Sequence, residues 1–173
     1  MITRRNFLMA CLAGAVLSPF KGTFASANKD RIIDMYNIHT GERLNICYCS
    51  AGRYDRHAIE SINYFLRCHY TNEVKEIDTG LLDLLCDIRD VVGDREEVKI
   101  ISGYRSAAYN EKLISQGRGV SRNSLHLHGL AIDFAIDGTG VDSISHIAKS
   151  FAAGGVGTYP EFVHIDVGRV RYW

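Results

Sequence analysis

The fold is decided by two short stretches in the C-terminal half of the chain, which read SLHLHGLAIDF (residues 124–134) and EFVHID (residues 161–166). Side chains alternate across a β-strand, so residues two positions apart share a face. The alternation places Asp133 on the face opposite Phe134 and its isoleucine neighbours, and it places His164 opposite its valine and isoleucine neighbours. The pattern predicts two strands that each bury an apolar face and expose a polar one.

These polar residues are spaced so that they could close on one metal ion. If the two strands are neighbours, Asp133 and His164 meet on the polar face. His126 can fold over them as a third member, because Gly129 frees the backbone for the return into the strand. Two imidazoles and a carboxylate match the three nitrogen or oxygen ligands that zinc takes in hydrolytic sites, where a bound water becomes the nucleophile. His128, two residues from His126, competes with it as a ligand.

The rest of the chain alternates between short apolar runs and segments with helical periodicity. Asp55 and Asp78 each precede a segment whose large apolar residues recur at helical spacing, and aspartate in that position caps a helix. Strands are predicted at residues 32–38, 44–48, 98–101, 130–136, 156–159 and 162–167, and further helices at residues 107–115 and 142–153. Short turns between strands favour a largely antiparallel sheet with helices packed mainly on one face. The predicted fold class is α+β.

Composition limits the domain count and the partners. The chain has 173 residues, of which 46% are hydrophobic, and this suits one ordinary domain. Its 20 basic residues are balanced by 20 acidic ones. A nucleic-acid-binding surface is usually basic, so we expect no nucleic acid partner. No repeat, linker or low-complexity segment indicates a second domain.

The N-terminus has the features of an export signal. The paired arginines of TRRNFL (residues 3–8) open an apolar run that small residues follow. A basic start, a short apolar region and a small-residue end are typical of a cleaved signal, and the paired arginines indicate the twin-arginine type. An uncleaved anchor is the alternative, but the run is shorter than the roughly 20 residues that span a bilayer. We expect a signal peptide over residues 1–27, a domain over residues 28–173, membrane contact only during export, and a periplasmic or otherwise exported location.

Four cysteines remain beyond the predicted signal: Cys47, Cys49, Cys68 and Cys86. In an exported protein they allow three disulfide pairings. Cys47 and Cys49 lie two apart on a predicted strand, so they point to one face and are not expected to bond to each other. Cys68 and Cys86 are assigned to apolar helix faces, where a free buried thiol is common. The pairing stays open.

Three motifs carry a resemblance to a known family. The pattern Ser-x-His-x-x-Gly-x-Ala-x-Asp at residues 124–133, Phe-Val-His-Ile-Asp at residues 162–166 and Ser-Gly-Tyr-Arg-Ser at residues 102–106 resemble those of the M15 metallopeptidases. Within that family the chain is most similar to the small twin-arginine-exported murein endopeptidases of the YcbK type, from about Ile32 to Trp173. The resemblance implies the fold of hedgehog domains and D-Ala-D-Ala peptidases, one zinc ion, and hydrolysis of peptide cross-links in peptidoglycan. Its partner would be the peptidoglycan peptide stems, and we expect a monomer.

The resemblance also implies roles for single residues. The zinc ligands correspond to His126, Asp133 and His164. Arg105 corresponds to the residue that binds the scissile carbonyl and the developing oxyanion, a task that suits its permanently charged guanidinium. Ser124 would hold substrate or the metal loop, and a turn-forming serine is an equal alternative.

The general base has two candidates. Glu161 occupies the place, three residues before the last histidine, where many M15 peptidases carry an acid. Asp166 is the rival, and its other role would be to orient the imidazole of His164. We favour Glu161 as the base and Asp166 as its support. Arg118 and Arg122, in the loop before the first motif, are candidates to bind substrate carboxylates, although loop charges are commonly only solvated.

Three alternatives accompany this interpretation. The first is a carboxypeptidase that removes a terminal D-amino acid. The second is a cell-wall-binding module that keeps the zinc site without catalysis, which the presence of Arg105 and Glu161 disfavours. The third is a copper or iron oxygenase, because two histidines and one carboxylate also bind non-haem iron.

Overall fold

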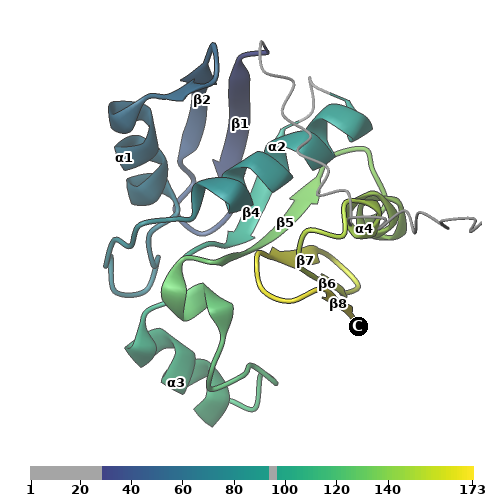
Figure 1. Ribbon diagram of the computed structural model, residues 1–173. Helices are drawn as coiled ribbons and strands as arrows, with labels where there is room; N and C mark the ends of the chain where they lie inside the picture. Colours follow the sequence, from purple (N-terminus) through teal and green to yellow (C-terminus); the bar gives the residue numbers. More distant parts are fainter. Residues whose placement is uncertain (1–28, 94–96) are drawn as a thin grey trace, which may run out of the picture.

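The computed structural model describes residues 29–93 and 97–173, and Figure 1 shows its ribbon. The predicted signal peptide and its cleavage point lie outside the described residues. The strands are β1 (Arg31–Asn37), β2 (Arg43–Ser50), β3 (Arg53–Tyr54), β4 (Val98–Ser102), β5 (Ala131–Ile136), β6 (Gly155–Thr158), β7 (Val163–Asp166) and β8 (Arg171–Tyr172). The helices are α1 (Arg56–Phe65), α2 (Thr79–Val92), α3 (Ala107–Ser115), α4 (Val141–Ser150) and the short 3₁₀ helix η1 (Leu125–His128). None of the helices in the two described ranges is long and apolar enough to cross a membrane.

The strands form one mixed sheet with the order β3-β2-β1-β4-β5-β7-β6-β8. Five neighbouring pairs are antiparallel, whereas β1–β4 and β6–β8 are parallel. The α+β class and the largely antiparallel sheet are confirmed, and the two parallel pairs make the sheet mixed. The parallel β1–β4 pair arises because the chain between the two strands crosses over through α1 and α2, a connection that a tight turn cannot replace.

Two aspartates set the starts of the first two helices. The carboxylates of Asp55 and Asp78 each accept hydrogen bonds from the backbone N–H groups two and three residues further on. These N–H groups have no acceptor within the helix, so each cap satisfies hydrogen-bond donors that would otherwise be unpaired. The helices predicted after these aspartates are confirmed, and α2 ends before Gly93 as its pattern indicates.

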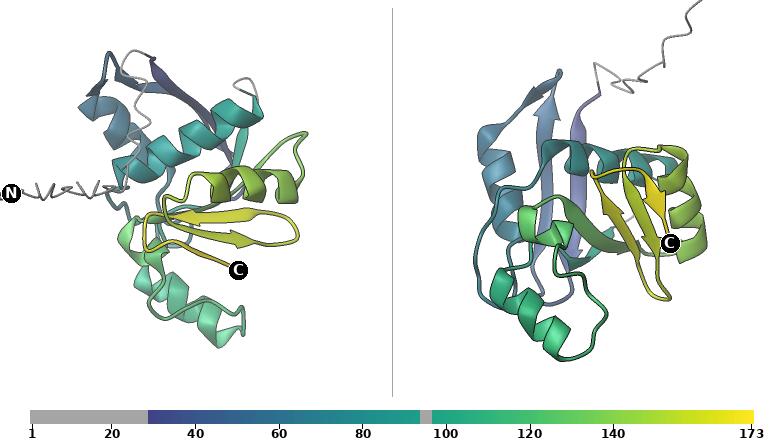
Figure 2. Two further views of the ribbon diagram at one scale, coloured as in Figure 1. Left: turned by 45° about the vertical axis from the view of Figure 1, so that its right-hand side comes forward. Right: turned by 60° about the horizontal axis from the view of Figure 1, so that its bottom comes forward.

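The apolar face of the sheet is covered by α2 and α4, which pack against each other. In Figure 1 α2 crosses in front of the strands, and α4 is seen nearly end-on beside β5; α4 contacts β5, β6 and β7. Ile132 and Phe134 of β5 and Ile165 of β7 are fully buried. Figure 2 shows α3 standing away from the sheet, so the packing of the helices mainly on one face stays a prediction.

The four cysteines of the described residues are free thiols. Cys47 is exposed on β2, and the other three are buried. Cys86 lies on α2 as expected. The assignment of Cys68 to a helix is wrong, because α1 ends three residues earlier, at Phe65.

Candidate metal centre

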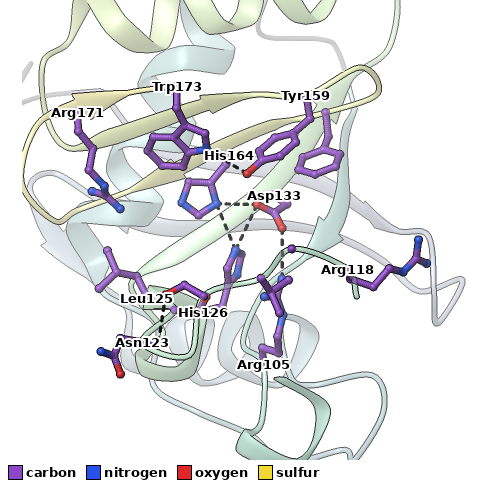
Figure 3. A pocket seen from close by; sticks show the side chains of 15 residues that line it. Arg105, Arg118, Asn123, Leu125, His126, Asp133, Tyr159, His164, Arg171 and Trp173 are labelled. Carbon is purple, nitrogen blue, oxygen red and sulfur yellow. Dashed lines mark hydrogen bonds and ion pairs between the residues drawn. The ribbon is translucent and has the colours of Figure 1, made fainter. Parts of the chain in front are cut away.

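The polar face of the sheet carries three side chains that point toward one another. Asp133 of β5 lies directly opposite His164 of β7 in antiparallel register. His126 comes from η1, just before β5, and its ring points at the other two side chains (Figure 3). The turn after η1 needs Gly129, which has a φ of 71° and would press any Cβ against the carbonyl oxygen of Glu76. The three residues that the sequence predicts to converge are thus brought together.

The distances within this group are short enough for one ion to be shared. One potential ligand atom from each residue lies within 4.8 Å of the other two. Asp133 Oδ1 is 2.7 Å from His164 Nδ1 and 3.2 Å from His126 Nε2. The two ring nitrogens are 3.3 Å apart. A single cation between them would contact all three atoms.

The outer nitrogen of each imidazole is held by an acceptor. His126 Nδ1 lies 2.8 Å from the carbonyl oxygen of Gly103, and His164 Nε2 lies 3.1 Å from Asp166 Oδ2. A carbonyl and an ionised carboxylate can only accept, so the outer nitrogens donate their protons to them. The inner nitrogens then turn their lone pairs toward each other and toward the Asp133 carboxylate. Such a cluster needs positive charge at its centre, from a proton or a metal ion, and two nitrogens with one oxygen form a donor set that zinc accepts.

The group is buried, although the sequence pattern predicted an exposed polar face. The exposed fractions are 2% for His126, 6% for Asp133 and 9% for His164. The prediction of exposure is wrong because η1 packs on β5 and the Trp173 ring lies 5.3 Å from the His164 ring. Burial alone would raise the pKa of Asp133, but the two histidines outweigh it and hold this pKa well below its usual range. Burial alone would lower the pKa of His164, but hydrogen bonds to Asp133 and Asp166 raise it.

Asp166 is fully buried behind His164 and is saturated with donors. Its Oδ2 lies 2.7 Å from Arg171 Nη2, and its Oδ1 accepts from Arg171 Nη1 and from the backbone N–H groups of Gly155 and Gly168. Burial alone would raise its pKa, but the hydrogen bonds from His164 and Arg171 hold the pKa well below its usual range. A carboxylate in this state accepts a proton poorly and is placed to orient the imidazole.

Arg105 lies on the other side of Asp133. It follows β4, whose Ser102 pairs with Asp133 in the sheet, and its Nη2 is 3.5 Å from Asp133 Oδ2. Its remaining side-chain contacts are long, at 3.3 Å to Ser102 Oγ and 3.4 Å to Asn110 Oδ1, and the buried Nε–H has no partner. Burial lowers the pKa of Arg105 against the opposing effect of Asp133, yet a guanidinium stays charged. It therefore has donors left for another oxygen atom.

A cavity of about 460 Å³ opens over this group. The three convergent residues and Arg105 line it, together with Ser124 and Arg118. Ser124 precedes η1, and its side chain makes no capping hydrogen bond, so a structural role as a cap does not account for it. Arg122 and His128 are exposed and do not line the cavity, and His128 therefore does not compete with His126 for the ion.

Glu161 is not brought to this group. It is exposed in the turn between β6 and β7, and it is not among the residues that line the cavity, whereas its neighbour Phe162 is. The strand alternation that places His164 does not extend to Glu161, because β7 begins only at Val163. No contact in the described structure supports the predicted role of Glu161 as base.

An aromatic wall that the sequence patterns did not reveal lines the cavity beside His164. It consists of Tyr159, Phe162 and Trp173. The Tyr159 and Phe162 rings stack at 4.5 Å, and Trp173 Nε1 donates to the Tyr159 hydroxyl oxygen at 3.0 Å. No spacing rule links these three residues, since two come from a turn and the third from the last position.

Comparisons with known proteins extend over nearly the whole chain. The sequence pattern of a family described as "Peptidoglycan L,D-endopeptidase MepK" matches residues 25–173. A protein of that name from Escherichia coli K12 is 38% identical over 164 residues, which cover 94% of this chain and 90% of the relative. A "Probable peptidoglycan L,D-endopeptidase MepK" from Haemophilus influenzae is 39% identical over 151 residues, which cover 86% and 81%.

With these matches, the fold and the site define the class of the protein, which is that of the M15 peptidases. The enzyme is a hydrolase, a peptidase of peptidoglycan. The chain belongs to the family described as peptidoglycan L,D-endopeptidase MepK.

Proposed function

We propose that this chain is a zinc-dependent endopeptidase that cleaves L,D peptide cross-links of peptidoglycan. The observation that carries the proposal is the convergence of two imidazole nitrogens and one carboxylate oxygen within 4.8 Å at the floor of the cavity. The names of the relatives in Escherichia coli and Haemophilus influenzae support the choice of bond.

The zinc ion would be held by His126, Asp133 and His164. The donor set supports zinc, because catalytic sites take three nitrogen or oxygen ligands and keep a further position open. When bound, zinc polarises a carbonyl and lowers the pKa of water. Asp166, itself held by Arg171, would keep the His164 ring in the orientation that presents its Nδ1. Metal analysis of the protein as purified tests the choice of zinc over copper or iron.

Arg105 would bind the carbonyl oxygen of the scissile bond and stabilise the negative charge that develops there. Its long contacts and its unpartnered Nε–H support this role, because unused donors are available to the substrate. Electrostatic stabilisation in a buried site exceeds that in water. Ser124 lines the cavity, and its hydroxyl makes no capping hydrogen bond to η1. This hydroxyl would bind the substrate backbone.

Glu161 is the base that we propose, and Asp166 is the residue that orients His164. The saturated hydrogen bonding of Asp166 disfavours it as a proton acceptor. Unliganded structures often hold a catalytic base away from its working position, so the exposed placement of Glu161 does not remove it as a candidate. Its neighbour Phe162 already lines the cavity, so only a small movement of the turn would bring Glu161 toward the substrate.

The substrate and the relatives' names support an exported protein. Peptidoglycan lies outside the cytoplasm, so we propose export through the twin-arginine signal of residues 1–27, with action on peptide stems as a monomer. The enzyme would contact the membrane only during that export.

The test is incubation of the purified protein with defined muropeptides, followed by mass spectrometry of the products. One set carries an L,D cross-link, a second carries a D,D cross-link, and a third carries an uncross-linked stem ending in D-Ala-D-Ala. The proposal predicts cleavage of the L,D set alone and its loss after chelation. Release of terminal D-alanine would instead identify a carboxypeptidase, and binding to sacculi without products would identify a wall-binding module.

A further inference from the structure

Tyr159 is held firmly in the aromatic wall of the cavity. Its backbone N–H donates to the carbonyl oxygen of Phe162 at 3.0 Å, and its ring stacks on the Phe162 ring with an interplanar angle of 15°. Trp173 Nε1 donates to the Tyr159 hydroxyl oxygen from the side. The indole lies close over Gly157, where an added Cβ would come within 2.7 Å of the ring. A phenol fixed by a stack and a hydrogen bond is preorganised.

The hydroxyl proton of Tyr159 is available to the cavity. The phenol oxygen accepts the indole proton, so this bond does not use the hydroxyl's own proton. Among residues 29–93 and 97–173, Trp173 is the one hydrogen-bonding partner of this hydroxyl. In the view of Figure 3 the hydroxyl end of Tyr159 points toward His164, and the residue as a whole is 38% exposed. Tyr159 and Arg105 both line the cavity over the three convergent side chains.

We propose that Tyr159 is a catalytic residue that donates its hydroxyl proton in a hydrogen bond to the oxyanion of the scissile carbonyl, together with Arg105. The inference rests on the proposed peptidase function and adds a second protein donor to it. The Arg105 guanidinium lies 3.5 Å from the Asp133 carboxylate, whose negative charge partly offsets the positive charge of the guanidinium. A neutral phenol has no such counter-charge. Because a fixed donor bonds the negatively charged transition state more strongly than the neutral carbonyl, it raises kcat more than it lowers KM.

The experiment compares wild type with Tyr159→Phe, which deletes the hydroxyl and keeps the stack on Phe162. The matched control is Tyr172→Phe, whose hydroxyl donates to the carbonyl oxygen of Lys149 and whose ring does not line the cavity. We expect kcat for the L,D-linked muropeptide to fall by about 10²-fold in Tyr159→Phe, as for removal of one oxyanion donor. KM, bound metal and the unfolding temperature should stay as in wild type, and Tyr172→Phe should match wild type throughout.

A second readout does not depend on turnover. A phosphinate pseudodipeptide imitates the tetrahedral oxyanion, so its Kd should rise in Tyr159→Phe by the same factor as kcat/KM falls. Trp173→Phe removes the N–H that orients the hydroxyl. Its kcat/KM should fall by about fivefold, which corresponds to the loss of one hydrogen bond.

The outcomes separate this inference from the proposed function. If wild type cleaves the muropeptide and Tyr159→Phe retains kcat and phosphinate affinity within twofold, the role of Tyr159 is overturned and the peptidase remains. If wild type with its full metal content cleaves none of the muropeptides, the proposed function fails, and the inference fails with it.

Discussion

The floor and the rim of the cavity are built in different ways. The floor holds His126, Asp133 and His164, which come from η1, β5 and β7 and are at most 9% exposed. The rim holds Arg118 in an irregular loop, and Glu161 lies in the turn next to it without lining the cavity; both side chains are exposed. Regular elements fix the positions of the metal-binding groups before any substrate arrives, whereas loops leave the substrate-facing groups free to adjust.

The largest effect is expected at the floor. His126→Ala should lose the bound metal and reduce muropeptide cleavage to the uncatalysed background, because two ligands remain where zinc needs three. The matched control is His128→Ala, from the same short helix, whose side chain is exposed and does not line the cavity. Metal content by mass spectrometry and turnover together check the pair. Equal losses of bound metal and turnover in both variants would show that His126 has no specific role as a ligand.

The next effect is expected at the rim. Glu161→Gln should lower kcat by about 10²–10⁴-fold if the carboxylate takes the proton, with the metal still bound. Glu111→Gln on the exposed side of α3 serves as the surface control, and both variants are followed by steady-state kinetics. A Glu161→Gln enzyme as active as wild type would assign the base to a group other than this carboxylate.

Arg105 lies between the floor and the substrate. Replacing it should lower kcat slightly less than replacing Glu161. Arg105→Ala should lower kcat by about 10²–10³-fold, the usual cost of one oxyanion donor. Arg105→Lys should recover only part of this loss, because a point charge lacks the planar fork of the guanidinium. Kinetics with metal content as the control check both variants. Full activity of the lysine variant would mean that charge alone suffices.

The smallest effect is expected behind the floor. Asp166→Asn should weaken metal affinity by about 10–100-fold, because the amide holds the His164 ring less firmly than the carboxylate. Competition with a chromophoric chelator measures the affinity, and thermal unfolding reports whether the loss of the Arg171 ion pair has altered the fold. An unchanged affinity with an unchanged fold would contradict the orienting role.

The contrast also explains how much the sequence could predict. Alternation in residues 130–136 and 162–167 predicted the faces of β5 and β7, because period two is a local property. The caps at Asp55 and Asp78 predicted the starts of α1 and α2 for the same reason. Both predictions depend on residues close together in the chain. The meeting of Asp133 with His164 was predicted only if the two strands are neighbours, and the structure supplies that pairing.

The remaining features depend on long-range packing. β3 and β8 have two residues each, too few for any periodicity, so the parallel β6–β8 pair was missed. Burial of the polar face depends on η1 and Trp173, which no strand pattern contains. The family's motif placed an acid at Glu161, but the turn rather than the strand decides where that side chain lies. The hydrogen bond between Tyr159 and Trp173 joins residues that only the folded chain brings together.

The central claim is that one zinc ion is bound by residues from three separate elements. Anomalous scattering from crystals of the purified protein, recorded on both sides of the zinc absorption edge, tests it most directly. We predict one peak per chain, about 2.0–2.2 Å from ligand atoms of His126, Asp133 and His164. A fully active protein whose crystals show no zinc peak at these three side chains would contradict the account.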